Sequence, residues 1–259
     1  MIDPADVAEA LIQARTSYTI LDDFPGGEYP ANVAEATAVL DEIEKQFMLP
    51  VGGRKAAFTA DAALKMMNVD GPACGPLFSA YIIPSPANLN LPAESWRGLE
   101  CEISFKMAAN LPARDAAYSV EEAAAAVGSM HPALEVVDSR VANGADHGGV
   151  AIIADHCGNA AFVYGAAVEN WRDLDLAALK VDLNVNGETV ITGSGDVVMG
   201  NPLNSLAWIA NSLSGRGKSL KAGEWVTTGS MMGIYKVPPG SSIVADFGAL
   251  GNVELVFAS

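Results

Sequence analysis

The sequence predicts an α+β fold in which helices come first and a β-rich body follows. Two observations carry this prediction: apolar residues recur at helical spacing through much of residues 1–75, and strand and hairpin signals dominate residues 76–259. Helices and strands do not alternate regularly, which argues against a parallel sheet built from repeated strand–helix–strand units. We expect a mainly helical segment, 1–75, and a β-rich body, 76–259, within one continuous domain, because no linker or low-complexity run separates them.

Helix-start signals place the helices of the first part. Asp3 followed by Pro4 is typical of a helix start, because aspartate caps the first turn and proline fits the first helical position. A second helix is expected from about Asn32, with apolar residues at helical spacing behind it. Thr59 is expected to cap a short third helix that ends at Met67.

Capping and turn signals also order the second part. Residues 119–122 form a capping box that opens an alanine-rich helix, and Asn201-Pro202 opens another helix that ends near Gly215. Asn186-Gly187, between two strand-like runs, predicts a tight hairpin, because both residue types tolerate positive φ. The last strands are expected at 224–228, 242–247 and 252–257.

Composition excludes several classes of protein. Half of the 259 residues are hydrophobic, so the chain can bury a large core and is not disordered. A net charge of −16 repels nucleic acid and anionic lipid, so neither is an expected partner. We find no apolar run of about 18 residues and no basic segment of a signal peptide. The three cysteines form no CxxC pair, so we expect reduced thiols in a cytoplasmic protein.

Two glutamates share one face of a predicted strand. Positions 99–107 alternate between apolar and polar residues, which indicates a half-buried strand. Glu100 and Glu102 then point the same way, with Cα atoms roughly 6–7 Å apart. Carboxylates this close repel one another unless a proton or a cation lies between them, and a hard divalent ion prefers such oxygen ligands. Glu135 follows in a second strand-like run. The residues alone leave open a polar face that simply meets water.

The histidines predict less. His131, His147 and His156 lack the spacing of a zinc site, and neither a P-loop nor a nucleophile elbow occurs in the sequence. Asp155 followed by His156 could act as an acid–base dyad. A packed, hydrogen-bonded histidine is the alternative that the residues leave open.

Short motifs along nearly the whole chain resemble one known family. They lie, in order and with similar spacing, at 52–59, 68–78, 99–105, 132–140, 154–156, 200–208, 228–230 and 250–253. Together they resemble the 2-keto-4-pentenoate hydratases and 4-oxalocrotonate decarboxylases of the fumarylacetoacetate hydrolase superfamily. The resemblance implies a β-rich roll with flanking helices, a lyase of aromatic meta-cleavage catabolism, and a homo-oligomer.

The resemblance also implies site residues. Glu100, Glu102 and Glu135 match the family's ligands for Mg²⁺ or Mn²⁺, and Lys55 matches its active-site lysine. We expect Lys55 on a loop after two glycines, near a bound 2-oxo or 2-hydroxydienoic acid. Asp155 and His156 are further catalytic candidates, as groups that could hold a water or bind substrate.

Three activities stay open. The first is hydration of a 2-hydroxy-2,4-dienoate. The second is decarboxylation of a 2-oxo-enedioate, which Arg54 or Arg140 would favour by binding the second carboxylate. The third is a catalytically silent partner subunit. Ala57, Ala73 and His156 depart from residues usual in the family. We therefore expect weak activity on the five-carbon dienoate and better activity on a larger or differently substituted 2-oxo acid.

Overall fold

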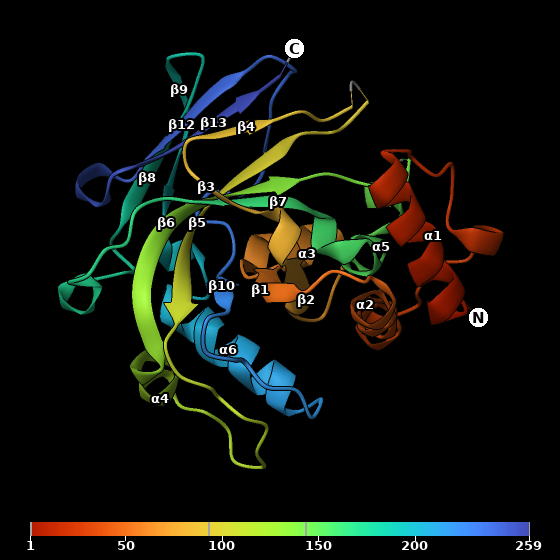
Figure 1. Cartoon of the computed structure of the whole chain (residues 1–259), viewed down its shortest axis with the longest axis horizontal. Helices are drawn as coiled ribbons and strands as arrows, with labels where there is room; N and C mark the ends of the chain where they lie inside the picture. The colour runs from red at the N-terminus through yellow and green to blue at the C-terminus, as the bar shows by residue number, and fades with distance from the viewer. Residues whose placement is uncertain (1, 93, 143, 259) are drawn as a thin grey trace.

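The fold joins two sheets and a group of N-terminal helices (Figure 1). The computed structural model describes residues 2–92, 94–142 and 144–258. The α-helices of this part of the chain are α1 (Pro4–Ser17), α2 (Val33–Gln46), α3 (Asp61–Met67), α4 (Val120–Ala125), α5 (Gly149–Ala154) and α6 (Pro202–Ser214). The strands are β1 (Val51–Ala57), β2 (Ala73–Phe78), β3 (Ile82–Pro84), β4 (Ala87–Leu89), β5 (Gly98–Met107), β6 (Val127–Val137), β7 (Asn159–Tyr164), β8 (Lys180–Val185), β9 (Glu188–Ser194), β10 (Trp225–Thr227), β11 (Tyr235–Lys236), β12 (Ser242–Asp246) and β13 (Asn252–Phe257).

The two sheets enclose the larger apolar core. Among the described residues, one sheet has eight strands in the order β2-β1-β10-β5-β6-β7-β3, with β11 also paired to β5. The other has five strands in the order β4-β13-β12-β8-β9. Apolar side chains of β5, β6, β8, β12 and β13 form one buried cluster, which also takes in α6. The predicted α+β class is confirmed.

Strand β5 is buried on both of its faces. Its apolar residues Leu99, Cys101 and Ile103 are 0% exposed within the larger core. On its polar face Glu102 and Ser104 are also 0% exposed, whereas Glu100 and Lys106 are partly exposed. The expected half-buried strand is therefore wrong on this point, and the open alternative of a water-facing polar edge is excluded for Glu102. A buried carboxylate needs hydrogen-bond donors, a counter-charge or a metal ion on the same face.

The N-terminal helices cover one end of the larger sheet (Figure 1). Helices α1 and α2 pack on one another and, with α5, form a second buried cluster that includes Phe78 of β2. Strands β1 and β2 belong to the eight-stranded sheet, and β2 runs across residue 75. The division into 1–75 and 76–259 stays a prediction; β2 crosses its boundary, and β1 pairs with β10 of the later part of the chain.

Most predicted element starts are confirmed. The Asp3 carboxylate accepts a hydrogen bond from the Ala5 amide at 2.9 Å, and Asn32 caps α2 in the same way. The capping box of α4 is complete. Asn186 and Gly187 have φ angles of 52° and 86°, as the predicted hairpin between β8 and β9 requires.

The predicted cap of α3 is wrong. The cap position is Ala60, which makes no side-chain bond to the helix. Phe58 takes a left-handed φ of 59°, so the chain turns before Thr59. The Thr59 side chain packs on Gly229 instead, where a Cβ would lie 2.1 Å from the threonine oxygen. In the described part of the chain, no helix is both long enough and apolar enough to cross a membrane.

Candidate metal centre and active site

Antiparallel pairing of β5 and β6 brings the three predicted glutamates together. Glu100 lies directly opposite Glu135 in the register, and Glu102 is two residues further along β5 on the same face. One carboxylate oxygen from each residue can be chosen so that all three lie within 4.8 Å of one another. Glu102 and Glu135 are fully buried, whereas Glu100 is partly exposed. Neighbouring strands thus supply one cluster of oxygen donors.

The unpaired oxygens of this cluster fit a cation. Glu102 Oε2 accepts hydrogen bonds from the Thr227 hydroxyl and, at 2.7 Å, from the Gly229 amide. Glu135 Oε1 lies 2.8 Å from the Lys55 ammonium and accepts a bond from Asn159 Nδ2 at 3.1 Å. The second oxygens, Glu102 Oε1 and Glu135 Oε2, are buried without a hydrogen-bond partner. Protein groups therefore fix one oxygen of each carboxylate and leave the other for a ligand such as a hard divalent cation.

Burial and mutual repulsion raise the pKa of two of these carboxyl groups. Burial, and then repulsion from Glu135, raise the pKa of Glu100 to about 7, although Lys55 opposes the shift. Burial followed by Glu135 and Glu100 raises the pKa of Glu102 well above its usual value. A cation between the three groups would offset this repulsion and would therefore favour their ionised forms.

Lys55 lies inside the cluster, on strand β1. Its side chain is nearly fully buried, and its ammonium also donates to the Cys157 carbonyl at 2.9 Å. Burial alone would lower the pKa of Lys55, but the carboxylates of Glu135 and Glu100 outweigh that effect and hold the pKa above its ordinary value. Lys55 is therefore charged and paired in this arrangement.

The expected loop around Lys55 is wrong. Gly53 precedes it within a strand that pairs with β10, not within a loop. A Cβ at Gly53 would lie 2.4 Å from the Trp225 carbonyl oxygen, so the missing side chain allows two backbones to approach closely. The glycine thus serves strand packing.

A cavity of about 740 Å³ opens above the cluster. Its lining includes Lys55 and Glu100 together with Cys157. The walls come from α3, from residues 137–142 and 144–146 at and after the end of β6, and from the segment 230–234 before β11. Burial raises the pKa of the Cys157 thiol to about 12, so this thiol is protonated at neutral pH. Glu100 of the carboxylate cluster and Lys55 therefore border a space large enough for an organic substrate.

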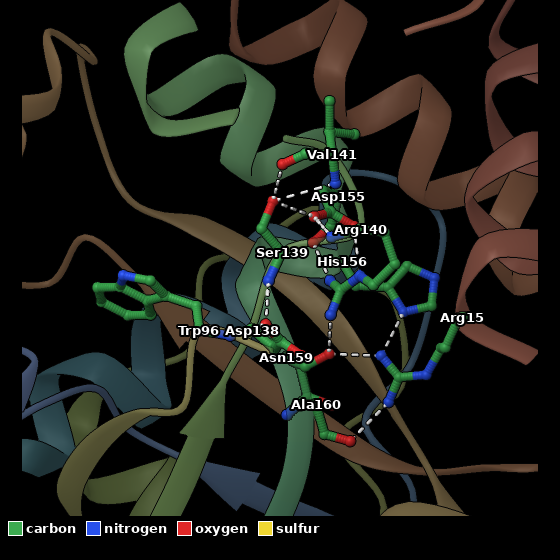
Figure 2. Close-up of polar contacts among 10 residues, drawn as sticks. All are labelled: Arg15, Trp96, Asp138, Ser139, Arg140, Val141, Asp155, His156, Asn159 and Ala160. Carbon is green, nitrogen blue, oxygen red and sulfur yellow. Dashed lines mark hydrogen bonds and ion pairs between the residues drawn. The ribbon is translucent and has the colours of Figure 1, made fainter. Parts of the chain in front are cut away.

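Asp155 and His156 point into different surroundings (Figure 2). Asp155 lines the cavity, and its carboxylate accepts bonds from the Arg140 side chain at 2.6 Å and the Arg140 amide at 2.8 Å. The His156 ring lies at the far side of this group, where its Nδ1 is 3.2 Å from Arg15. His156 is not among the cavity-lining residues. The two side chains bond to different arginines, so this structure does not form them into a dyad.

His156 is neutral in this position. Burial, and then the charges of Arg15 and Arg140, hold its pKa well below the ordinary value. Nδ1 therefore accepts the hydrogen bond from the Arg15 guanidinium, which also stacks over the Tyr81 ring with its carbon 4.1 Å from the ring centre. Of the two alternatives for His156, a packed and hydrogen-bonded side chain therefore fits this structure better than an acid–base partner of Asp155.

Two buried arginines converge on one backbone oxygen that sequence reasoning missed (Figure 2). Arg15 of α1 and Arg140 after β6 both donate to the Asn159 carbonyl, the latter at 2.9 Å. The Asn159 side chain in turn holds Glu135. The sequence carries no signal for this link, because Arg15 lies more than a hundred positions before Arg140 and Asn159 and only the fold brings α1 to the start of β7.

Neither arginine proposed for a second carboxylate reaches the cavity. Arg54 forms two bonds of 2.8 Å to Glu44 of α2, and Arg140 is bound to Asp155. Neither is among the lining residues. Ala57 lines the cavity, whereas Ala73 and His156 do not.

A family model and several known proteins are similar to this chain over most of its length. The model of the fumarylacetoacetate (FAA) hydrolase C-terminal family matches residues 59–257. A 2-keto-4-pentenoate hydratase of Burkholderia vietnamiensis is 31% identical over 98% of this chain and 95% of its own length. A 4-oxalocrotonate decarboxylase of Pseudomonas putida is 28% identical over 97% of this chain and 94% of its own length.

A solved structure resembles the whole fold. It is the 4-oxalocrotonate decarboxylase of Pseudomonas putida G7, described as complexed with magnesium and adipate. It superposes with a TM-score of 0.86 at 27% identity and covers 98% of this chain and 97% of that one. The similarity extends over the N-terminal helices as well as the two sheets.

Proposed function

Because this chain belongs to the fumarylacetoacetate hydrolase family, in the branch of the 2-keto-4-pentenoate hydratases and 4-oxalocrotonate decarboxylases, we propose that it is a divalent-metal-dependent hydratase of a 2-hydroxy-2,4-dienoic acid. One observation carries the proposal. Two buried glutamate oxygens without partners form one cluster with Glu100, and Glu100 and the charged Lys55 line a cavity. The hydratase relatives support the reaction type.

Mg²⁺ or Mn²⁺ is the proposed cofactor, and Glu100, Glu102 and Glu135 are its proposed ligands. An all-carboxylate donor set suits a hard cation. The three carboxylates and the Lys55 ammonium together carry two negative charges, which one divalent cation neutralises. When bound, the cation would act as a Lewis acid toward the substrate's 2-oxygen and carboxylate.

Lys55 is proposed to bind and stabilise negative charge on the substrate. Its ammonium is fixed by Glu135 and the Cys157 carbonyl, and it borders the cavity. A charged lysine at this place can donate a hydrogen bond to an enolate oxygen and supply a proton during ketonisation. Its position on a rigid strand keeps that geometry fixed before substrate binds.

Asp155 is proposed to orient the water that adds to the conjugated double bond. Arg140 fixes its carboxylate, and the neighbouring Ser139 hydroxyl lies 3.3 Å from Asp155 Oδ2. Asp155 and Ser139 both line the cavity. For His156 we propose a positioning role, because its neutral ring accepts a bond from Arg15 and so supports the arginine that holds Asn159.

The decarboxylase alternative has similar support from relatives but less from the cavity. A 4-oxalocrotonate decarboxylase is 28% identical to this chain. A dicarboxylic substrate needs a cationic partner for its second carboxylate, and neither Arg54 nor Arg140 is in the cavity lining. We therefore place hydration first. The silent-subunit alternative predicts a protein that binds neither metal nor substrate, and the predicted homo-oligomer can be measured by light scattering.

A spectrophotometric screen tests the proposal. Purified protein with Mg²⁺ or Mn²⁺ is offered 2-hydroxy-2,4-dienoates and 2-oxo-enedioates, and the products are identified by NMR. We expect loss of the dienoate absorbance and formation of a 4-hydroxy-2-oxo acid. Excess chelator should stop the reaction, and added metal should restore it. Release of carbon dioxide from the enedioates without any hydration would instead establish the decarboxylase.

A further inference from the structure

The cavity is much larger than the smallest dienoic acid requires. Its volume of about 740 Å³ lies within the range of pockets that hold drug-sized ligands, roughly 300–1,000 Å³. A five-carbon acid held at the floor by Lys55 and the carboxylate cluster would fill only a small part of it. Most of the cavity is therefore available to additional atoms at the distal end of a substrate.

Large apolar side chains gather at the mouth of this cavity. Ile20, Met66, Trp96 and Ile234 line it, with exposed fractions of 41%, 77%, 37% and 49%. They come from four separate segments: the residues after α1, helix α3, and the segments before β5 and β11. Figure 2 shows the indole of Trp96 directed away from Arg15 and Arg140. Exposed apolar surface of this kind is stabilised when an apolar group covers it.

The charges around the cavity are unfavourable for a second carboxylate. Within the described residues, Lys55 is the basic side chain in the lining, and it is already engaged at the floor. The walls instead carry the acidic residues Glu94, Asp138 and Asp146. Lys236 lies outside the lining, with its ammonium 5.9 Å from the centre of the Trp96 ring. A distal carboxylate would meet like charges and lose hydration, both of which oppose binding.

We propose that the substrate is a 2-hydroxydienoic or 2-oxo acid with one carboxylate and an extended apolar distal group. The single carboxylate and the 2-oxygen lie at the floor, and the apolar group occupies the upper cavity between Met66, Trp96 and Ile234. This inference rests on the proposed function for the orientation of the acid. It goes further by assigning the distal group and by excluding dicarboxylates as good ligands.

Matched pairs of unreactive 2-oxo acids test the substrate class by direct binding. Calorimetry on Mg²⁺-loaded protein compares 2-oxopentanoate with 2-oxooctanoate, and 2-oxooctanoate with 2-oxooctanedioate. Each methylene that is fully buried tightens binding by about fourfold, so the eight-carbon monoacid should bind at least about 10-fold tighter than the five-carbon one. The eight-carbon diacid should bind at least about 10-fold weaker than its monoacid.

Variants locate the effect. Met66→Ala should weaken 2-oxooctanoate binding several-fold and leave 2-oxopentanoate binding unchanged. Met48→Ala is the matched control, because Met48 is 91% exposed and lies outside the lining. Ile234→Arg should reverse the charge preference and improve binding of 2-oxooctanedioate relative to 2-oxooctanoate.

Several results would overturn the inference. These are equal affinity for the short and long monoacids, binding of the diacid as tight as that of the monoacid, or no binding of any 2-oxo acid to metal-loaded protein. Diacid binding that is lost in Lys236→Ala would show that the lysine serves the cavity after all. Failure of the proposed function looks different, because the ranking of ligands would hold while no dienoate is hydrated.

Discussion

Replacement of Lys55 by methionine should destabilise the metal-free protein and increase its dependence on metal. The ammonium lies 2.8 Å from Glu135 Oε1, and the two side chains are only 2% and 0% exposed. Removing one partner of a buried ion pair typically costs about 3–5 kcal/mol, because the other charge stays buried and unpaired. Methionine keeps the length of the side chain, so the effect reports the lost charge.

The size of the effect follows from the length of the chain. For a protein of this size, 1 kcal/mol shifts Tm by about 2–4 °C, so the metal-free variant should melt at least about 6 °C below the unchanged protein. Proton uptake by the glutamates reduces the loss near neutral pH, and the comparison is therefore made at pH 8. Saturating Mg²⁺ should raise Tm more in the variant, because three carboxylates no longer share an ammonium and attract the cation more strongly.

Differential scanning calorimetry with chelator and with Mg²⁺ measures both effects. Lys65→Met is the matched control, since Lys65 is an exposed lysine of α3. Turnover of a dienoate by the Lys55 variant should fall by about 10²–10⁴-fold if the ammonium takes part in proton transfer. An unchanged Tm without metal, together with the same gain from Mg²⁺ as in the unchanged protein, would refute the electrostatic argument.

Further expectations concern the ligands, their support and pH. Glu102→Gln should abolish high-affinity Mn²⁺ binding measured by EPR, because a neutral amide replaces a fully buried proposed ligand that has one carboxylate oxygen without a hydrogen-bond partner; binding as tight as before would remove Glu102 from the proposed metal site. Asn159→Leu should weaken metal binding by about 10–100-fold, because Glu135 loses the bond to Asn159 Nδ2; calorimetry with unchanged affinity would contradict this support. The metal-free protein should lose stability as pH rises from 4.5 through about 7, because burial and then Glu135 raise the pKa of Glu100 to about 7 and the folded state holds that proton more tightly than the unfolded chain. Denaturant titrations at pH 5 and pH 8 measure the free energy of unfolding and so check this expectation. If the free energy of unfolding of a Glu100→Gln variant is the same at both pH values, Glu100 is the source of the pH dependence.

Local signals in the sequence predicted the elements that depend on short-range chemistry. The caps of α1 and α2, the capping box of α4 and the hairpin at Asn186-Gly187 are all present. In each case the deciding contacts join residues within a few positions of one another. The cap at Thr59 failed because a distant contact with Gly229 and the turn at Phe58 decide where α3 begins.

The sequence and the tertiary structure each account for part of the carboxylate cluster of Glu100, Glu102 and Glu135. The alternation at 99–107 correctly placed Glu100 and Glu102 on one face of β5, but that pattern could not show that the face is closed. Burial of Glu102 depends on the strands and loops stacked against it, including Thr227 and Gly229 from the far end of the chain. The resemblance singled out Glu135, and the register of β5 with β6 places it opposite Glu100.

The sequence by itself determined the class of fold, the acidic character of the protein and the shared strand face of Glu100 and Glu102, because these follow from residue type and short-range periodicity. Only the tertiary structure decided that Lys55 lies on a strand inside the carboxylate cluster, that His156 faces Arg15 away from the cavity, and that the cavity is apolar at its mouth. These outcomes depend on contacts between residues far apart in the sequence, such as Lys55 with Glu135 and Arg15 with His156. Contacts of this kind leave no short-range pattern in the sequence, because strand pairing and helix packing decide which side chains meet.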